Sequence, residues 1–308
     1  MAVTDPDTGR VRRLRPPEGY RFAESVAPLA MGAHDPCARF VGGTFWWSCR
    51  TPDGPATLAL RRDGSELVAV GYGPGADRVL ARADAVAGLR DDPGGFPAVA
   101  AAHPVVARLA RTYRGLRLPA TGEVFPRLLR AVIEQKVSGK EAFRGYAATV
   151  RRFSEPAPGP LAGLWLPPEP AVIAAAPYWL FHPLGIEQRR ADTLRRAAAV
   201  ADRLAQASDP AEATRRMTSI PGIGPWTAAE VVRIAFGDPD AVSVGDWHLP
   251  NIVSVALTGR PRGDDAQMLR LLEPFRGHRG RVCVLLVAAG VQAPRFGPRM
   301  PLRSFAEF

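Results

Sequence analysis

The chain has 308 residues, of which 46% are hydrophobic and 23% charged, and this balance is typical of a soluble globular protein. Its formal net charge of +10 favours a polyanionic partner, either nucleic acid or an anionic membrane surface. All basic residues except Lys136 and Lys140 are arginines. A biased composition explains that choice of residue, but it does not explain the excess of positive charge.

No segment reaches the roughly 18 apolar residues that span a bilayer, and the N-terminus lacks the apolar segment of a signal peptide. We therefore expect a cytoplasmic protein. The three cysteines, Cys37, Cys49 and Cys283, are far apart, and the five histidines are scattered. Neither set has metal-ligand spacing, so the sequence predicts no zinc or iron–sulfur site.

The first part of the chain combines a polar start with a β pattern. Residues 1–20 are polar and proline-containing, and we expect them to be flexible. From about 40 to 72 the pattern is that of an antiparallel meander of about three strands, with Asp63 and Gly64 as a hairpin turn. Alternation within the first of these strands places three side chains on one face: Phe45, Trp47 and Cys49.

Helical stretches follow near 76–88 and 104–113. We interpret the pair Trp46 and Trp47 as packing rather than as a platform for stacked bases. The segment 115–123 is a connector with a proline and a glycine, and it separates an N-terminal α+β domain, 1–117, from a helical domain, 118–308.

The helical domain begins with an amphipathic helix within the segment FPRLLRAVIEQKVSG, 125–139. Its apolar residues recur at helical spacing: Phe125, Leu128, Leu129, Val132 and Ile133. Short connections then join helices predicted at 139–153, 169–176, 187–206, 211–218, 226–236, 247–257, 265–275 and 279–291. The last of these is apolar all round, which predicts a buried central helix.

Residues 219–232 read SIPGIGPWTAAEVV and predict a helix, a tight hairpin and a second helix. Pro221 ends the first helix, while Gly222 and Gly224 permit unusual backbone angles or a close backbone approach. Such a hairpin presents backbone N–H groups beside a helix N-terminus, which suits a phosphate. The segment is not a Walker A loop or a dinucleotide fingerprint, because the Gly-Lys-Ser/Thr and the third glycine are missing. A plain turn between helices is the alternative.

The segment AFGDPDAVSVGDWHLPN follows and places Asp246 twenty residues after Trp226 (246 − 226 = 20). With this spacing, the chain resembles the helix–hairpin–helix DNA glycosylase superfamily (HhH-GPD). Two further helices of that family are similar to the segments VFPRLLRAVIEQKVSGKEA and LGIEQRRADTL. The resemblance as a whole covers about 118–292. The β-bearing first domain makes the chain most similar to the bacterial 3-methyladenine-DNA glycosylase II group. The resemblance implies a mainly α fold, an all-α glycosylase bundle with a small N-terminal α+β domain that carries an antiparallel sheet.

By this resemblance Asp246 is the catalytic residue. Cleavage of an N-glycosidic bond builds positive charge on the sugar, and a carboxylate facing that charge stabilises it and can orient or deprotonate water. The other role for Asp246 is to cap the helix that follows it, and one carboxylate can do both.

Trp226 occupies the position where family members that also cleave the backbone carry a Schiff-base lysine. The resemblance therefore implies a monofunctional glycosylase without abasic-site lyase activity. An aromatic ring at this place also suits a flipped, alkylated purine, since such a base is cationic. The candidate base pocket comprises Trp226, Trp247, Tyr178, Trp179 and Phe181. For each of the last four taken singly, core packing is the interpretation that we favour.

The resemblance also implies a set of DNA contacts: Gln135, Lys136, Ser138, Pro221, Gly222, Ile223, Gly224 and Thr227. Lys136 stands where the family inserts an apolar wedge, so its stem inserts while its ammonium meets a phosphate, or another residue is the wedge. Glu230 stands where the narrower group can show an aromatic; it faces the pocket or, as we favour, the solvated face of its helix. No metal or cofactor is expected, and a monovalent cation at the hairpin–phosphate contact is left open.

The sequence thus predicts a monomeric base-excision repair enzyme, nucleoid-associated and independent of membranes, that acts on damaged double-stranded DNA. Its expected substrates are alkylated purines such as 3-methyladenine. One alternative is a glycosylase for a neutral lesion, hypoxanthine or an oxidised base. A second is a non-catalytic protein that uses the hairpin only to bind DNA, and the presence of Asp246 at the expected spacing counts against it.

Overall fold

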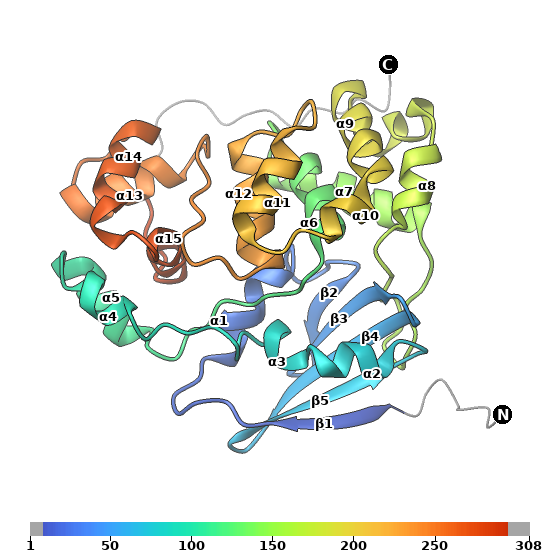
Figure 1. Ribbon diagram of the computed structural model, residues 1–308, viewed down its shortest axis with the longest axis horizontal. Coiled ribbons are helices and arrows are strands. Elements are labelled where there is room, and N and C mark those ends of the chain that lie inside the picture. Colours follow the sequence, from blue (N-terminus) through green and yellow to red (C-terminus); the bar gives the residue numbers. More distant parts are fainter. Residues whose placement is uncertain (1–8, 295–308) are drawn as a thin grey trace.

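The computed structural model describes residues 9–294 and combines one antiparallel sheet with a larger helical part (Figure 1). The sheet has the strand order β1-β5-β4-β3-β2. Its strands are β1 (Arg10–Leu14), β2 (Ala38–Val41), β3 (Thr44–Thr51), β4 (Gly54–Asp63) and β5 (Glu66–Tyr72).

The prediction that residues 1–20 are flexible is wrong for Arg10–Leu14, which forms the edge strand β1. This strand pairs with β5, with Val11 opposite Val70 and Leu14 opposite Leu67. Leu14 is buried, whereas Val11 is largely exposed. One buried side chain and the hydrogen bonds of β5 are enough to order an arginine-rich segment at a sheet edge. Residues 1–8 lie outside the described residues.

The central strands follow the predicted alternation. Phe45, Trp47 and Cys49 of β3 are all buried. The hairpin at Asp63–Gly64 joins β4 to β5 and sets Asp63 opposite Glu66. Trp46 stacks on Tyr72 with ring centroids 6.0 Å apart, so the tryptophan pair packs within the sheet domain as predicted.

Most helices begin and end close to the predicted residues, but the helices predicted at 76–88 and 187–206 are each divided in two, and two further short helices, at 22–26 and 96–100, were not predicted. Those of the first part are α1 (Phe22–Val26), α2 (Ala76–Ala81), α3 (Ala83–Val86), α4 (Phe96–Ala100) and α5 (Pro104–Thr112). Those of the second part are α6 (Val124–Ile133), α7 (Gly139–Phe153), α8 (Pro170–Ala175), α9 (Gln188–Ala199), α10 (Ala201–Ala205), α11 (Pro210–Thr218), α12 (Pro225–Ala235), α13 (Leu249–Thr258), α14 (Asp265–Leu272) and α15 (Arg279–Ala288). No helix of the described chain is long and apolar enough to span a bilayer.

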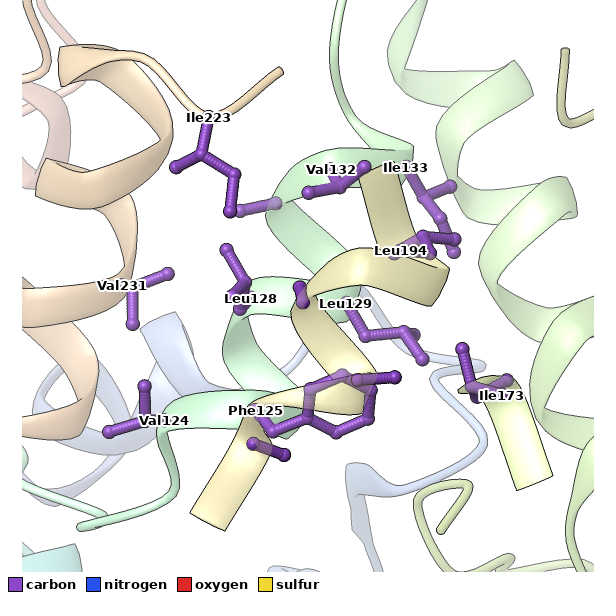
Figure 2. Close-up of a cluster of buried hydrophobic side chains, with 14 of the residues drawn as sticks. Val124, Phe125, Leu128, Leu129, Val132, Ile133, Ile173, Leu194, Ile223 and Val231 are labelled. Atoms are coloured by element: carbon purple, nitrogen blue, oxygen red, sulfur yellow. The ribbon is translucent and has the colours of Figure 1, made fainter. Parts of the chain in front are cut away.

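Helix α6 lies at the centre of the largest hydrophobic cluster (Figure 2). Leu128, Leu129 and Val132 are almost completely buried, as the amphipathic pattern predicts. Around them pack side chains from α8, α9 and α12, among them Ile173, Leu194 and Val231. Since α12 packs on α6, the rigid core fixes the helix that follows the glycine hairpin.

A separate cluster joins α4 and α5 to α13, α14 and α15. Figure 1 shows α4 and α5 beside α15, although they are more than a hundred residues apart in the chain. The boundary at 117/118 remains a prediction, but the packing of 96–118 crosses it. Helix α15 was predicted to be buried all round; it is buried as far as Leu286, whereas Val287 is 58% exposed.

Candidate functional site

The glycine hairpin between α11 and α12 is anchored by its isoleucine and shaped by its first glycine. Ile223 is buried and points into the cluster around α6 (Figure 2). Gly222 has φ +98°, and a Cβ built there would lie 2.1 Å from Thr193 Oγ1. Only glycine fits this position, because both the backbone angle and the space exclude a side chain.

The outer side of the hairpin is open. Pro221, Gly222 and Pro225 are exposed, and a Cβ on Gly224 would meet no atom within 4 Å. Gly224 caps α12, and no side chain accepts a hydrogen bond from the first turn of this helix. A backbone free of side chains and a helix N-terminus without a side-chain cap suit the close approach of a phosphate.

Gln135 supports the hairpin from within. Its side-chain Nε2 donates to the carbonyl oxygen of Gly222 at 3.0 Å and to Thr227 Oγ1 at 2.8 Å. Thr227 is only 2% exposed. Gln135 and Thr227, both predicted DNA contacts, are therefore hydrogen-bonded to each other, and Gln135 also binds the turn. Thr227 is too deeply buried in this structure to contact DNA.

The bend between α6 and α7 presents a lysine. Lys136 is exposed and has φ +55°, and it is the only residue other than glycine with a positive φ in the described chain. Ser138 instead caps α7: its hydroxyl accepts from the Glu141 N–H, and Glu141 Oε2 accepts from the Ser138 N–H at 2.8 Å. Ser138, a predicted DNA contact, thus has its side chain already hydrogen-bonded in a capping box.

The Asp246 carboxylate is held by three donors. Oδ1 accepts from the backbone N–H groups of His248 at 2.8 Å and Leu249 at 2.9 Å. Oδ2 accepts from Trp226 Nε1 at 3.0 Å. Through the two backbone bonds the carboxylate binds N–H groups at the start of α13, but this helix begins at Leu249, with His248 as its N-cap residue, rather than at 247 as predicted. The structure therefore brings together the two residues that the sequence singled out twenty positions apart.

The other predicted pocket residues separate into core and surface. Phe181 is completely buried, with its ring 5.0 Å from that of Phe153, which is a core position. Trp179 is 71% exposed and Trp247, next to Asp246, 83% exposed. Tyr178 is half-buried and meets His182 edge-on. Trp247 and Trp226 are thus the aromatic residues placed beside the carboxylate.

Sequence reasoning missed a buried charge network one turn after Trp226. Glu230 does not lie on a solvated face, as we had favoured: its carboxylate binds Arg127 Nη2 at 2.5 Å and Arg233 Nη2 at 2.7 Å, and accepts from Ser243 Oγ at 2.6 Å. Burial alone would raise the pKa of Glu230, but the charges of Arg233 and Arg127 and the hydrogen bonds hold it well below its usual value. Arg233, three residues after Glu230, was the signal available in the sequence.

Two cavities that the structure outlines lie elsewhere. One is lined by residues such as Leu118, Arg233 and Val284, and the other lies between the sheet and α6, with Asp35 and Tyr146 in its wall. Neither is lined by Asp246 or Trp226. The described residues contain no cluster of three or more metal-ligating side chains.

No protein-family profile and no curated protein matches the chain by sequence. Solved structures do match. The 3-methyladenine DNA-glycosylase from Archaeoglobus fulgidus is similar with a TM-score of 0.75 and 17% identity, over 90% of this chain and 97% of that one. The Clostridium acetobutylicum 8-oxoguanine glycosylase/lyase, in complex with double-stranded DNA containing cytosine opposite 8-oxoG, has a TM-score of 0.68 and 13% identity, over 93% and 99%.

A third match is the DNA-3-methyladenine glycosidase from Bacillus halodurans, with a TM-score of 0.50 and 20% identity, over 65% of this chain and 90% of that one. At these identities the likeness shows the fold. The chain therefore has the fold of the helix–hairpin–helix DNA glycosylases, with the mainly helical architecture and the N-terminal antiparallel sheet that the sequence predicted.

Proposed function

We propose that this protein is a monofunctional DNA glycosylase that hydrolyses the N-glycosidic bond of alkylated purines in double-stranded DNA. The observation that carries the proposal is the Asp246 carboxylate, held by two backbone N–H groups and by the indole N–H of Trp226 beside the hairpin. A fold shared with solved DNA glycosylases, one of them bound to DNA, supports it.

In this proposal, the open side of the hairpin and the first turn of α12 bind a phosphate of the duplex. The net charge of +10 favours the approach of DNA. The damaged nucleotide turns out of the stack toward Asp246. As the bond to the base breaks, positive charge develops on the sugar, and the fixed carboxylate stabilises it and orients the water that adds.

Trp226 is the reason for proposing a glycosylase without lyase activity. Its indole stands where lyase members of the family carry the amine that forms a Schiff base, and an indole nitrogen cannot form one. In this proposal the partly buried ring of Trp226 stacks on a cationic purine, a contact worth about 0.5–2 kcal/mol. A cationic base is already a good leaving group, so no second acid is required at the site.

A neutral lesion is the second candidate. The observation that favours it is the likeness to an 8-oxoguanine glycosylase/lyase over almost the whole chain. Lys136, exposed on a left-handed backbone and next to the Gln135 that contacts the hairpin, is the amine to test if strand cleavage is found.

The test is base release from matched duplexes that contain 3-methyladenine, 7-methylguanine, hypoxanthine or 8-oxoguanine, with the wild type and Asp246→Asn. We expect release of the methylated purines by the wild type, strand breaks only after alkali, and loss of release in the Asn variant. A wild type that binds these duplexes and releases no base contradicts the enzyme. Breaks without alkali, with an adduct trapped by borohydride, contradict the monofunctional assignment.

A further inference from the structure

The loop that carries Asp246 is attached to α12 at two points. At the first, Asp246 Oδ2 accepts from Trp226 Nε1 at 3.0 Å. At the second, Ser243 Oγ donates to Glu230 Oε1 at 2.6 Å. Trp226 and Glu230 are four residues apart on one helix, so the two attachment points are separated by one turn, about 6 Å along the axis.

Ser243 is also bonded directly to Asp246. Its carbonyl oxygen accepts from the Asp246 N–H at 3.2 Å, and its side chain is buried. Hydrogen bonds and the helix backbone therefore form a closed ring through four residues: Trp226, Asp246, Ser243 and Glu230. We call this ring the loop clamp. A closed ring restricts the loop more than either bond alone, because movement of Asp246 strains both contacts.

The Glu230 end of the loop clamp is itself fixed. Arg127 Nε donates to the Glu230 carbonyl oxygen at 2.9 Å, while Arg127 Nη2 and Arg233 Nη2 hold the carboxylate. Arg127 is 6% exposed and Ser243 5%. A buried carboxylate with such partners has few alternative positions, since leaving them would strand charges in a water-poor interior.

We propose that Ser243 and Glu230 are positioning residues: through the loop clamp they set the Asp246 carboxylate against α12, and so against the base bound beside the hairpin. This inference rests on the proposed function of Asp246. It gives a role to Glu230, which stands where the narrower group can show an aromatic residue. Glu230 acts on the loop and does not touch the substrate.

The first arm of the test uses Ser243→Ala, which removes one hydroxyl and leaves both arginines on Glu230. The control is Ser254→Ala in α13, because Ser254 is equally buried and its hydroxyl donates to the Arg262 carbonyl oxygen instead. We expect the single-turnover rate of base release to fall about ten- to one-hundred-fold in Ser243→Ala. Affinity for a duplex with a stable abasic analogue should stay within about two-fold of the wild type in both variants.

The second arm does not require activity. In a ¹H–¹⁵N spectrum, the indole signal of Trp226 is identified as the one missing from Trp226→Phe. We expect Ser243→Ala to shift this signal in the same direction as Asp246→Asn, while Ser254→Ala leaves it in place. A Trp226 signal that Asp246→Asn shifts and Ser243→Ala does not would overturn the loop clamp, and so would a signal that neither variant moves.

The two arms separate the failure of the inference from the failure of the proposed function. If the wild type releases no base from any duplex, the proposed function fails while the spectrum still decides whether Ser243 positions Asp246. If the wild type is active and Ser243→Ala keeps its full rate, the positioning role fails and the proposed function stands. An equal loss of rate in Ser243→Ala and Ser254→Ala also overturns the role, since it indicates general destabilisation.

Discussion

Trp226→Phe separates the hydrogen bond that Trp226 donates to Asp246 from the stacking on a flipped base that we propose for its ring. Phenylalanine keeps an aromatic face for a flipped base, but it has no N–H to donate to Asp246. Asp246 Oδ2 then loses the bond of 3.0 Å from Trp226 Nε1, whereas Oδ1 keeps both of its backbone donors. The variant therefore tests the orientation of the carboxylate while leaving its charge and its helix cap in place.

The expected fall in the rate of base release follows from the kind of hydrogen bond that is lost. A hydrogen bond to a charged group contributes about 1.5–3 kcal/mol, and each 1.4 kcal/mol in the barrier is a factor of about ten in rate. If the bond holds the carboxylate in its catalytic position, single-turnover release of 3-methyladenine should fall about ten- to one-hundred-fold. Trp226→Ala, which also removes the ring, should lose further affinity for the lesion duplex.

The assay compares these variants with Trp46→Phe, a control in the sheet domain whose ring stacks on Tyr72. Single-turnover rates at saturating enzyme report the bond-breaking step, and the enzyme concentration that gives half of this maximal rate reports affinity for the duplex that contains the lesion. If Trp226→Phe releases base at the wild-type rate, the hydrogen bond does not position the carboxylate. If Trp226→Phe instead loses affinity and keeps its rate, the indole acts through the base rather than through Asp246.

Three further predictions concern stability and DNA binding. Gly222→Ala should lower both the melting temperature and the affinity for duplex DNA, because its Cβ would meet Thr193 Oγ1 at 2.1 Å and its φ is +98°. An unchanged melting temperature and affinity would refute the inference that only glycine fits this position. The side chains of Arg281 and Asp91 form a buried ion pair and are 2% and 5% exposed. Asp91→Asn leaves the Arg281 charge beside a neutral partner, so the free energy of unfolding in urea should fall by about 3–5 kcal/mol. Glu230 has a lowered pKa in the fold, so its stabilisation is present above the pKa of the unfolded chain and is lost as the pH falls toward the folded value. Glu230→Gln should thus lower the urea midpoint near neutral pH and flatten its decline between about pH 5 and pH 3, and parallel pH curves would contradict this.

Local patterns predicted most of the elements. The periodicity of 124–133 indicated α6, and the glycines at 222 and 224 indicated the hairpin. The spacing of Trp226 and Asp246 predicted a pair that the structure joins by a hydrogen bond. These predictions were possible because each feature depends on residues that are near one another in the chain or are placed by a single turn.

Features that depend on distant partners were missed. Glu230 was assigned to a solvated face because helical spacing does not reveal Arg127, which lies 103 positions earlier on a helix that was predicted to be amphipathic. The strand Arg10–Leu14 has too few apolar residues to be recognised without β5 beside it.

The hydrogen bonds of Asp246 also distinguish between two ways in which it would act in the proposed hydrolysis. A carboxylate offers about four acceptor positions, and here three are used, two on Oδ1 and one on Oδ2. One position remains, on the oxygen that Trp226 also binds, and it is enough to orient one water molecule. Stabilising a cationic sugar requires only that the charge stay fixed, since a preoriented charge does not have to reorganise during the reaction. The arrangement therefore favours electrostatic stabilisation as the main contribution of Asp246, with the water held on Oδ2 in a subordinate role.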